Sequence, residues 1–259
     1  MFLPFWPLSI FRDFNILLYL LMMKSKGFRN PVLNKKIFAF VFFMSLSVSQ
    51  TRLCAQKSDI GSWYLYFGNQ QISKRWNWWN EMQYRNFNFM GDLEQLIFRT
   101  GIGYNLTENN NNVLLGYAFI YAEPYISGTD AKTSATENRI YQQFITRQNF
   151  GRVFIQHRYR IEERFIASDV RMRFRYFLSF NIPINQEVIK KDVFYFSAYN
   201  EIFLRTNTPV FDQDRIYGAV GYAINDYLRL ETGLMYQIFE DGNKLQFQFV
   251  FMNNIPFKH

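Results

Sequence analysis

The chain has 259 residues, of which 49% are hydrophobic and 20% aromatic. Its formal net charge of +8 lies mostly at the front, because residues 1–56 hold 7 of the 29 basic side chains and 1 of the 21 acidic ones. The nearly neutral remainder gives no reason to expect a nucleic-acid partner, which a basic chain would otherwise suggest. No stretch of that remainder is apolar for the roughly 18 residues of a membrane helix, which excludes a helical membrane protein.

Residues 24–56 have the pattern of a secretory signal peptide. A cluster of lysines with one arginine comes first, and an apolar run follows over residues 37–48. Small residues then mark a cleavage site near Ala55 or Gln56. We therefore expect residues 1–56 to be an N-terminal extension with a signal peptide, and residues 57–259 to be the mature domain.

A second apolar run, over residues 16–23, precedes the signal. Either the true start is Met22 or Met23 and the run is not translated, or the run is an N-terminal membrane helix; we favour the first. Cys54 is the only cysteine. If cleavage falls after it, the mature protein has no disulfide, no thiol nucleophile and no cysteine metal site.

From Gly61 to Phe257 the sequence repeats segments of roughly ten to fifteen residues that alternate apolar and polar side chains. Breaks rich in Asn, Asp and Gly separate the segments. A period of two is typical of β-strands, and this length suits a tilted strand that crosses a bilayer. We therefore predict an all-β fold, an antiparallel up-and-down transmembrane β-barrel. The expected strands cover residues 61–70, 74–88, 93–106, 112–122, 137–149, 151–165, 169–182, 192–205, 214–224, 227–240 and 243–256.

The strand count conflicts with a rule for such barrels. Bacterial single-chain barrels usually have an even number of strands, short periplasmic turns and longer outer loops. With a periplasmic C-terminus, the longest link, residues 123–136, becomes an outer loop, but eleven strands would then place the mature N-terminus outside. Either the 61–70 strand is not part of the wall or one strand is missing from the assignment. We expect ten or twelve strands and favour twelve.

The alternation places charged residues on one face of each strand. An arginine against lipid costs about 2–4 kcal/mol at the bilayer midplane, so we expect this face to point into the barrel. The expected interior cluster consists of Glu81, Arg85, Arg99, Arg158, Arg160, Glu162, Arg164, Arg171, Arg173, Arg175, Glu201, Arg205, Arg229 and Glu231.

This cluster has two interpretations. It is either an anion-attracting pore or binding site, because guanidinium groups concentrate positive potential in a confined space, or a structural plug in which arginines and glutamates satisfy one another. We favour the plug, and a small anionic solute is the partner that the first interpretation implies.

Aromatic residues near strand ends predict interfacial girdles, in which a ring lies at the apolar boundary with its polar edge in water. They are Trp63, Trp76, Trp78, Tyr104, Tyr121 and Tyr222. Phe257, near the end of the last strand, resembles the terminal aromatic by which outer-membrane barrels engage their assembly machinery. Lys258 and His259 follow it, which departs from that pattern.

The sequence offers little for catalysis. A barrel phospholipase needs a serine activated by a histidine on the lipid face. His157 is expected on that face, but position 159, two residues along the same face of the strand, is a tyrosine and not a serine. Asp212 and Asp214 lie in an expected outer loop and have the oxygen ligands for a hard cation, although aspartate is far commoner there as a turn residue. There is no phosphate-binding loop, zinc motif or dinucleotide fingerprint, so we expect no catalytic residue, metal or cofactor.

Several segments resemble one family. They are Asp59-Ile-Gly-Ser-Trp63, Ile72-Ser-Lys-Arg-Trp76, the nearby Glu81 and Tyr84-Arg85, and the strand from Arg171 to Arg175. Together they resemble the family catalogued as domain of unknown function 2490, over roughly residues 57–257. The resemblance implies a secreted outer-membrane barrel of Gram-negative bacteria, and it implies no activity and no site residues.

The sequence thus predicts a non-enzymatic outer-membrane barrel with an arginine-rich interior, either a structural or interaction protein or an anion-preferring channel. Its expected partners are outer-membrane lipid and the barrel-assembly machinery. Two alternatives remain open: a barrel enzyme acting on lipid or peptide, and a soluble lipocalin-like binder with an inverted barrel, apolar within and polar outside.

Overall fold

The computed structural model describes residues 60–108 and 110–257. The predicted signal peptide, its cleavage site and the alternative start at Met22 or Met23 lie outside the described residues. Within the described part, no helix has the length and apolar character to span a membrane.

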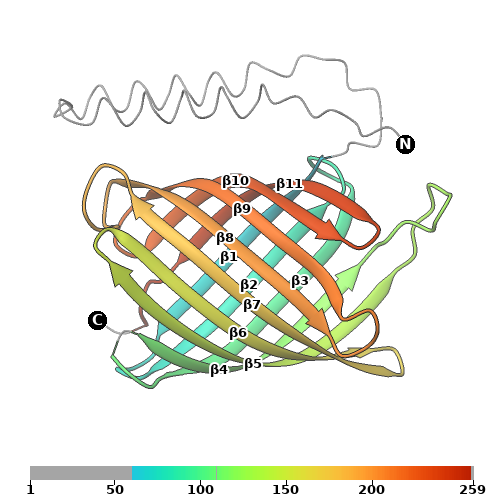
Figure 1. Cartoon of the computed structure of the whole chain (residues 1–259), viewed down its shortest axis with the longest axis horizontal. Coiled ribbons are helices and arrows are strands. Elements are labelled where there is room, and N and C mark those ends of the chain that lie inside the picture. Colours follow the sequence, from blue (N-terminus) through green and yellow to red (C-terminus); the bar gives the residue numbers. More distant parts are fainter. Residues whose placement is uncertain (1–59, 109, 258–259) are drawn as a thin grey trace, which may run out of the picture. The chain divides into compact units, whose positions relative to one another are not determined.

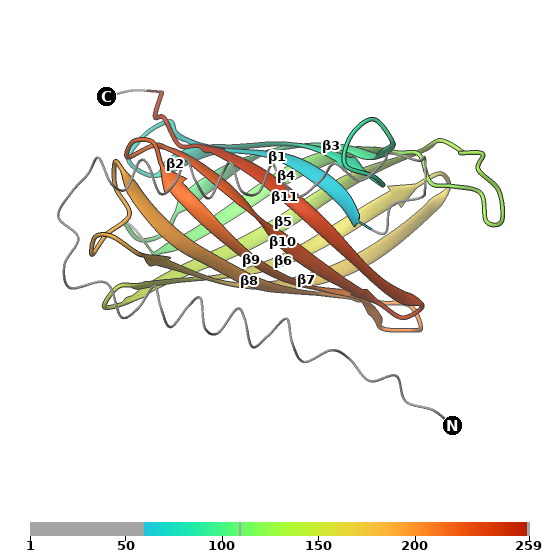
Figure 2. The ribbon, with the colours of Figure 1, turned by 90° about the horizontal axis from the view of Figure 1, so that it is seen from above.

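Eleven strands wind around one closed barrel (Figures 1 and 2). Consecutive strands pair in antiparallel fashion, in an up-and-down order. The strands are β1 (Ile60–Gln71), β2 (Trp76–Asn86), β3 (Leu93–Asn105), β4 (Asn111–Ala122), β5 (Ala135–Phe150), β6 (Val153–Ile166), β7 (Asp169–Pro183), β8 (Val193–Arg205), β9 (Phe211–Ala223), β10 (Leu228–Phe239) and β11 (Gly242–Asn253).

The barrel closes through a parallel pair. β1 runs beside β11 in the same direction, from Ile60 opposite Leu245 to Gly68 opposite Asn253. The expectation of an even count is therefore wrong: all eleven predicted strands belong to the wall, and the preferred twelfth is not among the described residues. A parallel ladder satisfies the edge N–H and C=O groups as an antiparallel one does, so an odd number of strands leaves no free edge.

Turn chemistry explains where the strands end. The turn from β5 to β6 contains Gly151 at a φ of 56°, a left-handed conformation that costs glycine little because it has no Cβ. Ala167 adopts a similar φ of 51° between β6 and β7. The predicted strand boundaries agree with the observed ones to within a few residues because most breaks carried this chemistry in the sequence.

The odd count places the start of β1 and the end of β11 at opposite ends of the barrel. The N-terminal end, where β1 begins, carries the longest loop between strands, residues 123–134, which protrudes in Figure 1. Lys132 fixes this loop, with Nζ 2.5 Å from Asp92 Oδ1 and 2.7 Å from the Leu93 carbonyl oxygen. The Tyr125 hydroxyl also donates to Asp92, and this bond raises the pKa of the phenol. The loop is therefore anchored to the neighbouring 87–92 turn.

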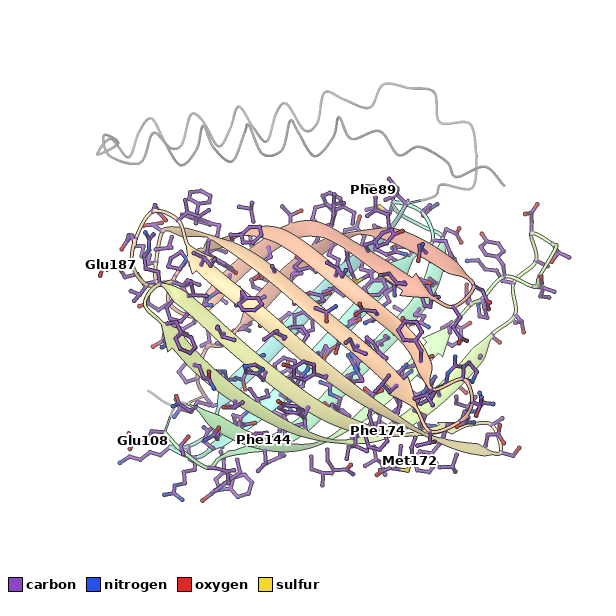
Figure 3. All side chains as sticks on the ribbon, viewed as in Figure 1. Phe89, Glu108, Phe144, Met172, Phe174 and Glu187 are labelled. Carbon is purple, nitrogen blue, oxygen red and sulfur yellow. The ribbon has the colours of Figure 1, made fainter. Side chains whose placement is uncertain are left out.

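The outward face of the wall is apolar. Figure 3 shows Phe144, Met172 and Phe174 projecting away from the barrel. Each of the middle strands exposes large hydrophobic side chains at alternate positions, among them Met82, Phe98, Leu115, Ile140, Ile161, Phe174, Phe196, Ile216 and Leu234. Because successive side chains of a strand point to opposite faces, this pattern forces the intervening residues inward.

Inward-facing tyrosines lie over glycines of neighbouring strands. Tyr141 is opposite Gly116, Tyr195 is opposite Gly221, and both tyrosines are fully buried. A Cβ on either glycine would overlap the tyrosine ring, so only glycine allows the rings to lie flat across the wall. These pairs fill interior volume that charged side chains do not occupy.

One aromatic prediction is wrong. Trp63 lies inside the barrel with 2% of its surface exposed, packed with Leu65 and Tyr217, and is not an interfacial residue. Both faces of β1 carry aromatic and apolar side chains, so alternation alone did not tell which face pointed inward. Trp76, by contrast, faces outward and is 48% exposed.

Candidate functional site

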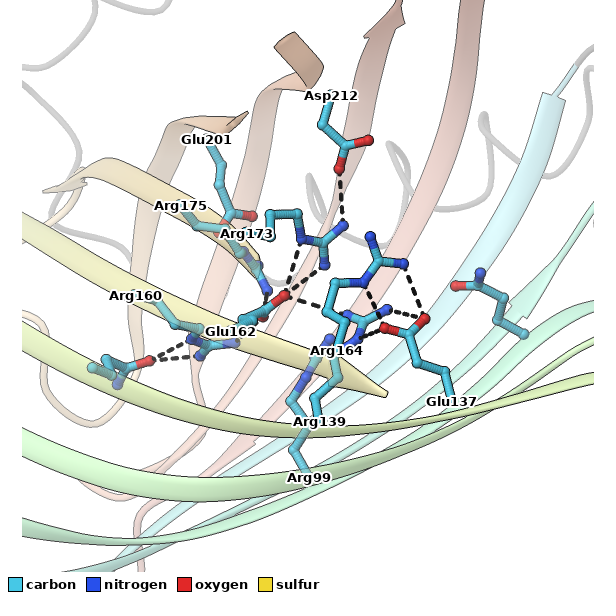
Figure 4. A network of polar contacts seen from close by, with 12 residues as sticks. Arg99, Glu137, Arg139, Arg160, Glu162, Arg164, Arg173, Arg175, Glu201 and Asp212 are labelled. Atoms are coloured by element: carbon cyan, nitrogen blue, oxygen red, sulfur yellow. Dashed lines mark hydrogen bonds and ion pairs between the residues drawn. The ribbon is translucent and has the colours of Figure 1, made fainter. Parts of the chain in front are cut away.

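Glu162 of β6 is the centre of a buried network of ion pairs (Figure 4). Its side chain is inaccessible, with 0% exposure. Arg173 and Arg175 of β7 approach its carboxylate to 2.6 and 2.5 Å, and Arg139 and Arg160 lie at 3.5 Å. The register brings Arg173 directly opposite Glu162, and the alternation places Arg175 and Arg160 on the same interior face. One carboxylate is thus shared by four guanidinium groups.

Two further glutamates extend this network. Glu137 of β5 accepts hydrogen bonds from Arg139 and from Arg164, with N–O distances of 2.6 and 2.5 Å. Glu201 of β8 pairs with Arg158 at 2.7 Å and Arg175 at 2.6 Å. Such charge-assisted bonds are the strongest hydrogen bonds in proteins, so the network ties β5, β6, β7 and β8 together across the interior.

A fourth acid pairs on the opposite wall. Glu81 of β2 forms a buried ion pair with Arg99 of β3 and also accepts from Gln83. The Trp79 indole N–H lies 3.2 Å from the same carboxylate. The Glu81 side chain is therefore bonded from both β2 and β3.

The charges within the interior do not balance. Four glutamates, Glu81, Glu137, Glu162 and Glu201, pair with eight arginines: Arg99, Arg139, Arg158, Arg160, Arg164, Arg173, Arg175 and Arg215. The fifth buried glutamate, Glu231, accepts its bond from the Tyr195 hydroxyl at 2.9 Å. The interior therefore holds more positive than negative charge.

The excess is greatest where interior side chains of β1, β2 and β9 come together. Arg85 donates to the amide oxygens of Gln83 and Gln95, and among the described residues it forms no ion pair. Its guanidinium carbon lies 3.6 Å from the centre of the Trp63 ring, and that of Arg215 lies 5.0 Å from the same ring. We call Trp63, Arg85 and Arg215 the acid-poor cluster.

Most of the predicted interior residues lie inside the barrel. Arg171 is the exception, because its side chain is 49% exposed beyond the wall and pairs with Asp169. Arg205 lies at the rim, where its Nη2 is 3.4 Å from Glu240. The other members of the predicted set that are nearly inaccessible are Glu81, Arg85, Arg99, Arg160, Glu162, Arg173, Arg175, Glu201 and Glu231.

Several charged residues of the interior were not predicted, among them Glu137, Arg139 and Arg215. Glu137 and Arg139 begin the interior face of β5, and both lie within the predicted 137–149 strand, so their alternation with Tyr141 was readable in the sequence. Arg215 continues the interior face of β9 between Gln213 and Tyr217, and this alternation was readable in the sequence.

The residues considered for catalysis or metal binding have other partners. His157 faces outward, and its Nδ1 lies 2.9 Å from the Tyr176 hydroxyl. Asp212 accepts from Arg173 at 3.1 Å, whereas Asp214 accepts from Asn200 at 2.7 Å. The described residues contain no group of three or more potential His, Cys, Asp or Glu metal ligands.

Residues 60–248 match the family model described as "Protein of unknown function (DUF2490)". No curated protein and no solved structure matches the chain.

Proposed function

The chain belongs to the DUF2490 family of proteins of unknown function, and from its barrel we propose a non-enzymatic protein of the bacterial outer membrane whose interior is closed by a plug of paired arginines and glutamates. After secretion across the inner membrane, its role is structural or in interactions through its end loops. Its partners are outer-membrane lipid and, during insertion, the barrel-assembly machinery.

The outward apolar face carries this proposal. Soluble monomers rarely expose contiguous apolar patches larger than about 300–600 Å², whereas here large hydrophobic side chains face outward on neighbouring strands around the wall. Burial in lipid would remove this surface from water. The charged interior is the reverse of the apolar interior that a soluble lipocalin-like binder requires.

Strand length and chain direction support an orientation. The strands have 11 to 16 residues, and a tilted strand needs about 9–11 to cross a bilayer. We place the 123–134 loop on the extracellular side and the end of β11 in the periplasm, where the assembly machinery would bind the last strand. The Phe257 ring stacks on Trp78 at that end, with 5.6 Å between ring centres.

The packing favours a plug over an open channel. The Glu162 side chain has 0% exposure, and its arginine partners arise from three strands. A conducting pore needs a continuous water path, and the buried ion pairs that join β5, β6, β7 and β8 occupy interior space in which that path would run. An anion-preferring channel is the second candidate, because the interior carries excess arginine.

A barrel enzyme is disfavoured by the surroundings of His157, the histidine considered as its base. The His157 ring contacts the Tyr176 hydroxyl and stacks on its ring, so it has a tyrosine partner in place of a serine nucleophile. Lipase and protease assays on His157→Ala and on the parent protein should give the same result. A loss of activity in this variant would support the enzyme instead.

Fractionation and conductance test the proposal separately. In cells, the protein should pellet with outer membranes and resist extraction by carbonate; recovery in the soluble periplasm would refute the membrane location. In planar bilayers, the purified protein should give no steady single-channel events. Steady anion-selective conductance would refute the plug and support the channel.

A further inference from the structure

We propose that the acid-poor cluster of Trp63, Arg85 and Arg215 binds one small oxyanion, such as inorganic phosphate, inside the barrel. This inference goes beyond the plug and does not depend on the membrane location, because it rests on the barrel interior alone.

The first argument is uncompensated charge. Arg85 is 6% exposed and is bonded only to neutral amide oxygens. Arg215 is 8% exposed, and its acid, Glu201, is 3.8 Å away and already bonded at 2.7 and 2.6 Å to two other arginines. Arg215 and Arg99 both repel Arg85, and Glu94 and Glu81 attract it without forming an ion pair with it. Buried charge is costly unless it is paired, so an anion between these groups would stabilise the folded barrel.

The second argument is a set of unused donors. The Trp63 indole N–H and the Arg215 Nε–H are buried and have no hydrogen-bond partner. Buried donors are paired in the great majority of proteins, and each unpaired one calls for an explanation. The Tyr199 hydroxyl, which interacts electrostatically with both arginines, donates only to the weakly accepting Met235 sulfur at 3.4 Å. Two of these unused donors belong to the cluster itself, on Trp63 and Arg215.

The donor types select the ligand class. A guanidinium group presents its N–H bonds as a planar fork that matches two oxygens of one oxyanion. An indole N–H and a phenol O–H donate single bonds to further oxygens. Phosphate has enough oxygens to accept from all of them, and the excess positive charge of the interior favours an anion over a neutral solute.

The cluster lies next to the N-terminal end of the barrel. Arg85 is the last residue but one of β2, and the following turn, residues 87–92, folds to the outside. The Phe89 carbonyl accepts from Ser62, and the Phe89 ring contacts Phe247 and Phe249 on the outward face of β11. The turn therefore leans away from the mouth nearest to Arg85.

The test measures phosphate binding by the purified protein in detergent, in a chloride-free methanesulfonate buffer of fixed ionic strength. Calorimetry should show saturable binding of one phosphate, and phosphate should raise the midpoint of thermal unfolding. Arg85→Gln and Arg215→Gln should each weaken the affinity at least tenfold. Arg171→Gln, which removes an exposed arginine outside the interior, should leave the affinity unchanged.

Two further variants keep the test decisive if a glutamine variant does not fold. Arg85→Lys keeps the charge but loses the planar fork, so it should bind phosphate more weakly than the parent protein and more tightly than Arg85→Gln. Trp63→Phe keeps a ring for cation–π contact but loses the N–H, so it should weaken phosphate binding and abolish any phosphate-dependent change in tryptophan fluorescence from this site. Absence of saturable binding by the parent protein, or equal affinity in all interior variants, would overturn the proposal.

Discussion

The two walls of the interior solve the problem of buried charge differently. On the β5–β8 wall, Glu137, Glu162 and Glu201 lie among arginines of the same wall that approach them to between 2.5 and 3.5 Å. Among the interior side chains of β1, β2 and β9, Arg85 donates to amide oxygens and lies over the Trp63 ring, and Arg215 shares that ring and is 3.8 Å from Glu201. Carboxylates neutralise arginines on the first wall, whereas the second carries excess positive charge.

This difference predicts which interior residues maintain the folded structure and which are available to bind an anion. A buried ion pair adds little net stability compared with apolar packing, but removing one partner leaves an uncompensated charge. The β5–β8 wall should therefore be intolerant of substitution. In the acid-poor cluster, excess positive charge already destabilises the folded barrel. The cluster should therefore tolerate the loss of an arginine, and added anions should stabilise it.

The largest effect should come from Glu162→Gln. This change leaves Arg139, Arg160, Arg173 and Arg175 without their shared carboxylate, and removal of one partner of a buried pair costs about 3–5 kcal/mol. Urea unfolding of the detergent-solubilised protein, followed by gel mobility of the folded form, measures the loss.

Glu163→Gln is the matched control for this change. Glu163 is the next residue along β6 and faces outward, where it accepts from Gln142 at 3.2 Å. We expect its unfolding midpoint to stay close to that of the parent. Equal losses in the two variants would mean that the interior network does not determine stability.

Arg175→Gln and Arg85→Gln compare the walls directly. Arg175 bonds both Glu162 and Glu201, so its loss should cost about 3 kcal/mol of unfolding free energy. Arg85→Gln leaves no carboxylate without its ion-pair partner and removes the repulsion between Arg85 and Arg215. It should therefore change the free energy of unfolding by less than about 1 kcal/mol. The same urea titration in phosphate-free buffer measures both, and a reversed order would refute the assignment of the two walls.

The period of two predicted this architecture well because strand pairing is local in sequence. The alternation and the Asn- and Gly-rich breaks located all eleven strands, and the cost of arginine in an apolar surrounding located the interior face. The parallel closure between β1 and β11 could not be predicted, since it joins segments from opposite ends of the chain and leaves no local signal.

The sequence also could not predict which interior side chains pair with one another. Alternation shows that Glu162 faces inward, but its four arginines depend on the registers of β5, β6 and β7 together. Trp63 was misplaced because β1 is apolar on both faces, so no charged residue of its own marks the inner side. Its position follows only from pairing with Arg85 of β2.

A glycine substitution tests how tyrosine rings fill the interior between β8 and β9. Gly221→Ala adds a Cβ that overlaps the Tyr195 ring, and overpacking of this kind costs about 1–3 kcal/mol. Gly218→Ala, three residues earlier on β9, adds a Cβ with nothing within 4 Å and should be nearly neutral. Urea midpoints measure both, and the double variant Gly221→Ala with Tyr195→Ala should lose less than the two single losses combined, because the overlap is gone.

The smallest effect should come from the exposed end of β7. Arg171 and Arg173 lie two residues apart on one face, but Arg171 pairs with Asp169 in solvent, where their side chains are 49% and 63% exposed. Exposed pairs contribute about 0–1 kcal/mol, so Arg171→Gln should shift the urea midpoint barely, and raising the salt concentration should erase the shift. Arg173→Gln should cost several times more and respond little to salt, because its partner Glu162 is fully buried. If the two variants lost equal stability, burial would not be what distinguishes the interior arginines from those outside it.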